Sequence, residues 1–295
     1  MAGHVSEAAH IVLFGPNGQV GARLLMALEA AGYEVTSIDR ARCDFASATA
    51  MDIAKIIRAV EPALVINAAA YTAVDKAEDE QALAMRINGE VPGFIAAACM
   101  EQHAKLLHLS TDYVFDGQRG APYVETAETH PLNVYARSKL AGEQAVRNAG
   151  GHVFRLQWVY DNRGKNFFLT MKKLLRERDE LRVVADQLGT PTSACAIAEA
   201  VVRAIPKIID GALPADVYHL TAGGHTSWHG FACAIARSIG SAVPVLPITS
   251  AEYPTPAARP KDARMNGDKL ASYGISMPHW REQLAQTIGE PDADA

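Results

Sequence analysis

The sequence predicts an α/β fold in which a doubly wound parallel sheet is followed by a smaller, mixed C-terminal lobe. Over the first half of the chain, short apolar segments alternate with helical segments, as in strand–helix–strand units. A glycine-rich turn follows the first apolar segment, where the first helix begins. Together these observations indicate a sheet of the Rossmann type, whose ligands bind at the carboxyl ends of the strands.

The pattern opens with residues 10–14, an apolar run of the buried-strand kind, and with a turn from Gly15 to Gly21. Glycines recur at every third position of this turn, and the helical spacing of Leu24 and Leu28 follows it. A strand, a Gly-x-x-Gly-x-x-Gly turn and a helix allow the backbone to approach a pyrophosphate at the helix N-terminus. The segment therefore predicts a dinucleotide site.

The second predicted strand, residues 33–38, ends in Asp39 and Arg40. Asp39 lies 18 residues after Gly21, where a carboxylate would meet the 2′-hydroxyl of an adenosine ribose. Arg40 is suited instead to a 2′-phosphate. The two side chains indicate different dinucleotides, so the choice between NAD and NADP stays open.

Apolar periodicity and capping signals place the other elements. They are expected as a helix from a Ser47 cap to Ala59, a strand over 62–66, a charged helical stretch over 75–86, a helix over 92–102, strands over 105–109 and 152–156, a helix over 166–177, a strand over 181–184, a helix over 194–205, a strand over 217–221 and a helix over 279–288. Three alanines at 68–70 leave room for a flat ligand, or simply pack tightly.

The alternation of strands and helices changes after Trp158. We therefore expect a dinucleotide-binding domain made of residues 10–158 and about 191–222. Residues of about 159–190 and 223–290 would form a smaller lobe that closes over a substrate.

Acid–base chemistry is indicated by Tyr135 and Lys139, which lie four residues apart and therefore on one helix face. A fixed ammonium favours ionisation of a neighbouring phenol. Thr111 ends the strand that begins at residue 105, and its hydroxyl is placed to hold a carbonyl oxygen from the other side. Such a trio can move a proton to or from a carbonyl–alcohol pair. The spacing alone also fits a surface pair, but the long loop between Thr111 and Tyr135 favours a functional site.

Composition excludes several classes of partner. The 295 residues carry a net charge of −5 and no long basic run, which argues against nucleic acid. No apolar segment is long enough to cross a membrane, and residues 1–9 lack the basic and apolar regions of a signal peptide. We expect a cytoplasmic protein whose first nine residues form a loose leader.

Metal and disulfide chemistry are not expected. His225 and His229 have a helical spacing, but no carboxylate is near, so they are interpreted as polar groups at a helix start. Four scattered cysteines are expected to be free, buried or partly buried thiols: Cys43, Cys99, Cys195 and Cys233.

Several motifs occur in order along the chain. They are Gly-Pro-Asn-Gly-Gln-Val-Gly at 15–21, Asn-Ala-Ala-Ala-Tyr-Thr-Ala-Val-Asp-Lys-Ala-Glu at 67–78, Ser-Thr-Asp-Tyr-Val-Phe-Asp-Gly at 110–117, Tyr-x-x-x-Lys-Leu-Ala-Gly-Glu at 135–143, Trp-Val-Tyr at 158–160 and Asp-Gln-x-Gly-x-Pro-Thr at 186–192. Together they resemble the dTDP-4-dehydrorhamnose reductases, a branch of the extended short-chain dehydrogenase/reductases. Matches at 218–224 and 253–260 extend the resemblance into the C-terminal lobe.

The resemblance implies reduction of the 4-keto group of dTDP-4-dehydro-6-deoxy-L-mannose to dTDP-L-rhamnose, with NADPH or also NADH. It implies that Tyr135 protonates the forming alkoxide, that Lys139 lowers the pKa of Tyr135 and binds the nicotinamide ribose, and that Thr111 holds the keto oxygen. With the glycine turn and Arg40, the expected cofactor contacts are Gly15, Gly18, Gln19, Val20, Asp39, Arg40, Asp44, Phe45, Ala70, Tyr71, Thr72, Tyr135 and Lys139. The implied sugar site consists of Val74, Thr111, Asp112, Tyr113 and Trp158.

Three positions depart from the family pattern. Ala136 replaces a glycine, which is a small steric change, and Leu156-Gln157 replaces a pair of small hydroxyl residues next to the sugar site. Arg23 stands where some members carry a glutamate of a magnesium-linked dimer. A homodimer is therefore compatible with the resemblance, whereas its magnesium-bridged form is not expected.

Two other functions stay open. A sister reductase would deliver the hydride to the other face of the ketone and yield a different sugar, such as dTDP-6-deoxy-L-talose. A non-catalytic relative, the regulatory subunit of methionine adenosyltransferase, binds a dinucleotide, but the intact trio of Tyr135, Lys139 and Thr111 favours an enzyme.

Overall fold

The computed structural model describes residues 9–290, and a six-stranded parallel sheet forms its centre. The strands are β1 (His10–Phe14), β2 (Glu34–Ile38), β3 (Leu64–Asn67), β4 (Lys105–Thr111), β5 (His152–Leu156) and β10 (Val217–His219). Across the sheet they follow the order β10-β5-β4-β3-β1-β2. The chain runs from β1 outward on one side and returns to β3 on the other, so a crevice opens between the ends of β1 and β3. The predicted doubly wound sheet is confirmed.

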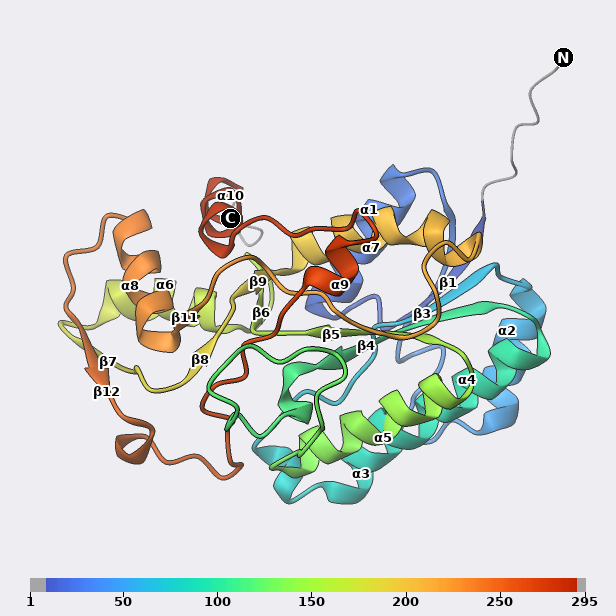
Figure 1. Ribbon diagram of the computed structural model, residues 1–295, viewed down its shortest axis with the longest axis horizontal. Coiled ribbons are helices and arrows are strands. Elements are labelled where there is room, and N and C mark those ends of the chain that lie inside the picture. The colour runs from blue at the N-terminus through green and yellow to red at the C-terminus, as the bar shows by residue number, and fades with distance from the viewer. Residues whose placement is uncertain (1–8, 291–295) are drawn as a thin grey trace, which may run out of the picture.

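Helices cover both faces of this sheet (Figure 1). On one face lie α1 (Gln19–Ala30) and α7 (Ala194–Ile209), and on the other lie α2 (Ala50–Val60), α4 (Val91–Glu101) and α5 (Val134–Asn148). The strands alternate their side chains between the two faces: Ile11 and Leu13 pack under α1 and α7, whereas Val12 and Phe14 pack under α2 and α4. Both faces of the sheet are therefore buried, which explains why its strands are almost continuously apolar.

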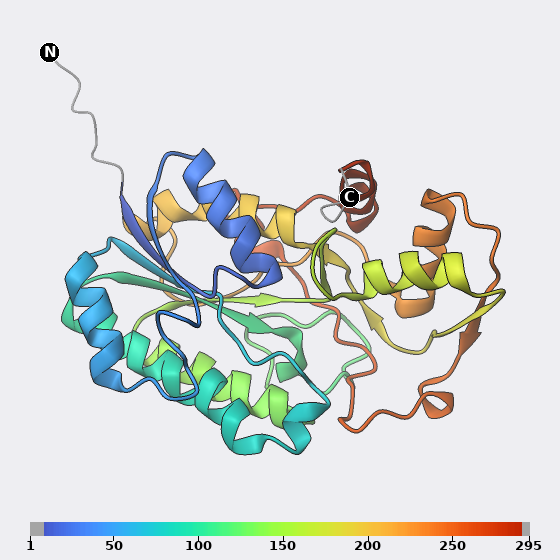
Figure 2. The ribbon, with the colours of Figure 1, turned by 180° about the vertical axis from the view of Figure 1, so that it is seen from behind.

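A second group of elements extends beyond the carboxyl end of β5, as Figure 2 shows from behind. It consists of α6 (Phe167–Glu177), β7 (Leu181–Val184), α8 (Trp228–Ser238), β12 (Val245–Ile248) and α10 (Trp280–Gly289). The strands β7 and β12 pair in parallel, and Phe231 and Trp280 are fully buried in an apolar cluster separate from those of the sheet. Leu270 of α9 (Asp268–Ala271) departs from this grouping because it packs into the core of the sheet.

Short elements complete the described chain. Two-residue strands pair as β6 (Val159–Tyr160) with β9 (Thr192–Ser193) and as β8 (Leu188–Gly189) with β11 (Thr226–Ser227). The short helical turns are η1 (Lys76–Glu78), α3 (Gln81–Met85), η2 (Arg86–Glu90), η3 (Asp112–Val114) and η4 (Ser250–Glu252).

Some predicted boundaries are wrong. Thr49 caps α2, not Ser47, because Thr49 and Asp52 form a reciprocal capping box. The stretch over 75–86 is divided among η1, α3 and the π-helical η2 rather than forming one helix. Helix α7 continues through Pro206 to Ile209, four residues past its expected end at 205. The burial of Ile208 against the sheet stabilises this last turn by more than the backbone hydrogen bond lost at Pro206 costs.

The prediction of free cysteines is confirmed. All four cysteines are free; Cys43 and Cys99 are buried, and Cys195 and Cys233 are partly buried. Between residues 9 and 290, no helix is both long enough and apolar enough to cross a membrane. The predicted leader lies, apart from Ala9, outside the described residues.

A buried ion pair joins α5 to the sheet. Glu143 on α5 accepts two hydrogen bonds from Arg155 on β5, at 2.5 Å from Nη2 and 3.0 Å from Nε, and a third from the Ser110 hydroxyl on β4. Both charged side chains are almost completely excluded from solvent. The Arg155 guanidinium also lies over the ring of Phe115, 4.9 Å from its centre. Every oxygen of the carboxylate is therefore satisfied, as a buried charge requires.

We expect Arg155→Met to lower the free energy of unfolding by about 3–5 kcal/mol, because Glu143 is left as an unpaired buried charge. The double variant Glu143→Leu with Arg155→Met should recover most of that loss, since it removes both charges. Denaturant unfolding of the two proteins measures the difference. Equal losses in the single and double variants would show that packing around Arg155, rather than charge pairing, is responsible.

Candidate active site

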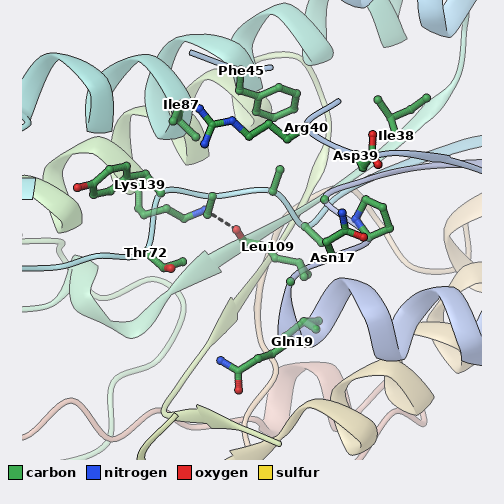
Figure 3. Close-up of a pocket in the computed structure, with 18 of the residues that line it drawn as sticks. Asn17, Gln19, Ile38, Asp39, Arg40, Phe45, Thr72, Ile87, Leu109 and Lys139 are labelled. Carbon is green, nitrogen blue, oxygen red and sulfur yellow. Dashed lines mark hydrogen bonds between the residues drawn. The ribbon is translucent and has the colours of Figure 1, made fainter. Parts of the chain in front are cut away.

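A cavity of about 550 Å³ lies at the carboxyl ends of β1, β2, β3 and β4 (Figure 3). The glycine turn closes one side of it, and Tyr135 and Lys139 from α5 line the opposite side. Every cofactor contact expected from the sequence lines this cavity. The sequence motifs therefore converge on one elongated space.

The glycine turn packs against the end of β3 more closely than any side chain would allow. Gly15 has a φ of +81°, and a Cβ there would lie 2.6 Å from the backbone nitrogen of Ala69. A Cβ on Gly21 would lie 1.9 Å from the carbonyl oxygen of Gly15. The first turn of α1 carries no acidic side chain, no side chain caps the helix, and Gln19 and Val20 at its start line the cavity. The first backbone N–H groups of a helix have no partner within it. This geometry suits a pyrophosphate at the positive end of the helix.

The end of β2 presents one carboxylate and one guanidinium to the cavity. Asp39 accepts a hydrogen bond from the backbone N–H of Arg42 at 3.0 Å, which fixes its orientation at the strand end. Arg40 donates to Asp44 at 3.1 Å, but its side chain is 82% exposed and free to move. Phe45 packs against Phe14 at 5.5 Å between ring centres and offers an apolar surface for a base. Asp39, Arg40 and Phe45 fit the adenosine end of a dinucleotide. The carboxylate suited to a 2′-hydroxyl and the guanidinium suited to a 2′-phosphate both line the cavity.

The N-terminus of α5 is held firmly, which positions Tyr135 in its first turn. The Asn133 side chain caps the helix by accepting from the Ala136 N–H, and Glu78 accepts from the Val134 N–H at 2.8 Å. The Thr111 hydroxyl at the end of β4 lies close enough to the Tyr135 hydroxyl to lower its pKa. The structure therefore brings two members of the predicted trio into contact.

The pKa of Tyr135 is shifted in the opposite direction to the expected one. Burial raises it to about 12, the Thr111 side chain lowers it in part, and the nearby Asp112 raises it further. A dominant effect of the Lys139 ammonium would lower this pKa, but desolvation of the phenolate is the larger effect here. A protonated phenol is nevertheless the form required of a proton donor.

Lys139 lies one helical turn beyond Tyr135 and points toward β4. Its Nζ donates to the carbonyl oxygen of Leu109 at 2.6 Å, drawn as a dashed line in Figure 3, and lies 3.3 Å from Nε2 of His108. Burial lowers the pKa of Lys139 to about 8, although Glu143 acts to raise it. The amine can therefore gain and lose a proton near neutral pH.

Three of the predicted sugar-binding residues, Thr111, Asp112 and Tyr113, lie next to Tyr135. Asp112 is buried, receives hydrogen bonds from Gln157 at 2.9 Å and from the Thr111 hydroxyl at 3.1 Å, and has a pKa that burial raises to about 7. The ring of Tyr113 meets that of Tyr135 edge to face, 5.7 Å between centres. Val74 is only partly buried and precedes η1.

Trp158, the last of the predicted sugar-binding residues, has an unusual backbone conformation. Its φ of +43° is rare for a residue with a side chain. The indole stacks on Trp228 of α8 with 3.6 Å between centres and covers Gly189, where a Cβ would lie 2.4 Å from the ring. Trp158 therefore joins the end of β5 to the second group of elements.

Other residues of the cavity were not predicted from the sequence. Asn17, Ile38, Ile87, Ser110 and Val159 line it as well. Asn17 lies inside the glycine motif, so its place in the dinucleotide cavity could have been predicted from the sequence. Ile87 comes from the π-helical η2, and no sequence signal places that segment beside the cavity.

Three residues singled out in the sequence, Arg23, His225 and His229, do not line the cavity. Within residues 9–290, no group of three or more histidine, cysteine, aspartate or glutamate side chains is arranged to hold a metal. His225 precedes β11 and His229 belongs to α8, so the two do not share a helix. Arg23 pairs with Asp161 at 2.6 Å and with Glu290 at 2.5 Å, and both contacts raise its pKa.

Comparisons with known proteins agree with this geometry. The model of the family described as "RmlD substrate binding domain" matches residues 9–292. A dTDP-4-dehydrorhamnose reductase of Burkholderia thailandensis is 43% identical over 92% of this chain and 95% of its own, and one of Escherichia coli is 39% identical over 95% and 97%. The crystal structure of a dTDP-4-dehydrorhamnose reductase from Bacillus anthracis in complex with NADP superimposes with a TM-score of 0.89 at 35% identity, covering 95% of this chain and 99% of that one. The chain belongs to the RmlD family, the dTDP-4-dehydrorhamnose reductases.

Proposed function

We propose that this protein reduces the 4-keto group of dTDP-4-dehydro-6-deoxy-L-mannose to give dTDP-L-rhamnose, using NADPH or NADH. The observation that carries the proposal is the contact between the Tyr135 and Thr111 hydroxyls at the inner end of the dinucleotide cavity, with Lys139 one helical turn away. When bound, the nicotinamide supplies the hydride. The relatives named above support this substrate and cofactor.

The residues of the chain have separate roles in this proposal. The N-terminus of α1 and the glycine turn hold the pyrophosphate, and Asp39 with Arg40 receives the adenosine ribose. Thr111 holds the keto oxygen, and Tyr135 gives its proton to that oxygen as negative charge develops there. Burial keeps the phenol protonated until then. Lys139 replaces the proton lost from Tyr135 and holds the ribose next to the nicotinamide.

We also propose a division of the chain by ligand. Residues 10–158 with about 191–222 would bind the dinucleotide, and about 159–190 with 223–290 would bind the sugar nucleotide. The separate apolar cluster of α6, α8 and α10 supports this division, while Leu270 in the core of the sheet ties the second part to the first. The sugar site would lie between them, among Val74, Asp112, Tyr113 and Trp158.

The stereochemistry at C4 leaves one specific alternative. Gln157 departs from the small hydroxyl residue that the family resemblance implies at this position, and its amide donates to Asp112 at 2.9 Å and to the carbonyl of Ala263. If the hydrogen bond from Gln157 gives Asp112 a different orientation in the sugar site, the ketone would bind with its other face toward the hydride. Incubation of the protein with the dTDP-4-keto sugar and NADPH or NADH, followed by determination of the C4 configuration, separates dTDP-L-rhamnose from dTDP-6-deoxy-L-talose. No turnover of any dTDP-keto sugar would favour a dinucleotide-binding regulatory subunit.

For assembly we propose that magnesium does not bridge two copies of this chain through the region of Arg23. The Arg23 guanidinium is paired there with Asp161 and Glu290, so both carboxylates already have a cation. A homodimer formed through other contacts is compatible with this arrangement.

Tyr135→Phe is expected to lower kcat by about 10²–10⁴, because it removes the proton donor while leaving the ring in place. NADPH affinity and thermal stability should stay near those of the parent. Single-turnover reduction of the keto sugar with NADPH bound is the measurement, and Tyr33→Phe, outside the cavity, is the matched control. A Tyr135→Phe rate within a few-fold of the parent would mean that another group supplies the proton.

Arg40→Ala is expected to weaken NADPH roughly tenfold, or about 1.4 kcal/mol, with little change for NADH. The reason is that a guanidinium recognises a 2′-phosphate, which only NADPH carries. Dissociation constants for both dinucleotides measure the effect, and Arg42→Ala is the neighbouring control. Equal loss of both dinucleotides would show that Arg40 does not face the 2′ position.

Trp158→Ala should raise KM for the keto sugar about tenfold, because an aromatic face next to the sugar site is lost. Dinucleotide affinity should hardly change. Steady-state kinetics are to be compared with thermal unfolding of the same variant. If stability falls while KM is unaltered, Trp158 serves the packing against Trp228 and not the sugar.

A further inference from the structure

Two buried polar side chains beneath Lys139 have no part in the reaction as proposed above. Asn67 ends β3 and His108 lies on β4, and neither is reached by solvent. The amide oxygen of Asn67 accepts from the backbone N–H of Ala69 at 3.1 Å, its amide nitrogen lies 3.1 Å from Nδ1 of His108, and Nε2 of His108 lies 3.3 Å from Nζ of Lys139. A continuous polar chain thus connects the cavity wall to Lys139.

The directions of these hydrogen bonds fix the tautomer of His108. Because the Asn67 oxygen is engaged by the Ala69 N–H, it is the Asn67 NH₂ group that faces Nδ1 of His108. An amide nitrogen only donates, so Nδ1 must accept and carries no proton. A neutral imidazole then has its proton on Nε2. Burial together with the neighbouring Lys139 lowers the pKa of His108 well below its usual value, so the ring is neutral.

This tautomer restricts the charge on Lys139. The Nε2–H of His108 points at Nζ, and a neutral amine accepts that hydrogen bond through its lone pair. An ammonium has only donors, so it would oppose the Nε2–H. Protonation of Lys139 therefore requires His108 to move its proton to Nδ1, which in turn opposes the Asn67 NH₂ group.

The other groups around Lys139 do not cancel this effect. Glu143 favours the ammonium, but its oxygens are engaged by Arg155 and Ser110. On the remaining sides, Tyr135 is a neutral phenol on the same helix, and η2 presents the uncharged Asn88, which donates to Ser138. The charge on Lys139 is thus set mainly by burial, by Glu143 and by the imidazole below it.

We propose that His108, with its tautomer held by Asn67, is a positioning residue that poises Lys139 between amine and ammonium and so sets the alkaline limit of turnover. This inference rests on the proposed role of Lys139 in returning a proton to Tyr135. An acid–base group works best when it exchanges its proton near the working pH. As pH rises through the titration of Lys139, the ammonium is lost and the return of the proton slows. The imidazole places that limit at a lower pH than Lys139 would otherwise give.

The first test reads the tautomer directly in the parent protein. ¹⁵N chemical shifts of the histidine ring distinguish a protonated from a bare nitrogen, and His108→Phe identifies the signals. Above the titration of Lys139, we expect the His108 proton on Nε2. A proton on Nδ1 under the same conditions would overturn the proposal. This measurement does not depend on activity, so it stands even if Tyr135 proves not to be the proton donor.

The second test reverses the bias with a nearly isosteric change. The carboxylate in Asn67→Asp still accepts from Ala69 but also accepts from Nδ1–H, which frees Nε2 to accept from an ammonium. The alkaline limb of kcat should move upward by about one pH unit. Because the new charge also acts directly on Lys139, the same substitution is made in His108→Phe, where most of the shift should vanish.

Two outcomes of the second test contradict the proposal. One is an unchanged alkaline limb in Asn67→Asp, and the other is an equal shift with and without the imidazole, which would mark a direct charge effect. Dinucleotide affinity and thermal unfolding establish that each variant is folded. If a variant is not, the tautomer measured in the parent protein decides the matter.

Discussion

The site depends on one buried contact, the ion pair between Glu143 on α5 and Arg155 on β5. Tyr135 and Lys139 both lie on α5, so their positions over β4 are fixed only as well as that helix is fixed. The pair restrains α5 from the side of the sheet, while on the other side Gly142 allows η2 to approach so closely that a Cβ would lie 2.0 Å from the Asn88 carbonyl oxygen. A helix held from two sides keeps its acid–base groups in place.

Burial then determines the chemistry of the groups so placed. Desolvation raises the pKa of Tyr135 to about 12 and that of Asp112 to about 7, and lowers that of Lys139 to about 8. Each shift favours the uncharged form, although one group is a base and two are acids. Tyr135 is thus uncharged at neutral pH, and small changes of pH or of surroundings alter the charge on Asp112 and Lys139. In so poorly solvated a region, charge that develops on a substrate oxygen would interact strongly with these groups.

Sequence reasoning identified the fold and the cavity well because both depend on local signals. The turn at Gly15 and Gly21 requires glycine for steric reasons, and the Tyr135–Lys139 spacing follows from helical geometry. Prediction from the sequence fails for properties that depend on contacts between segments far apart in the chain. The pKa of Tyr135 depends on how deeply the phenol is buried, which no spacing reports, and Ile87 reaches the cavity from an irregular helix. The connection from Asn67 to His108 joins two strands whose register only the sheet defines.

The stacked indoles of Trp158 and Trp228 have a consequence of a different kind. Two stacked chromophores 3.6 Å apart couple their electronic transitions. When the two transition dipoles are skewed, circular dichroism contains a paired signal that neither ring gives alone. One indole is attached to the end of the central sheet and the other to α8. The amplitude of that signal would then change with any displacement of α8 relative to the sheet, so the protein carries an intrinsic spectroscopic probe of that movement.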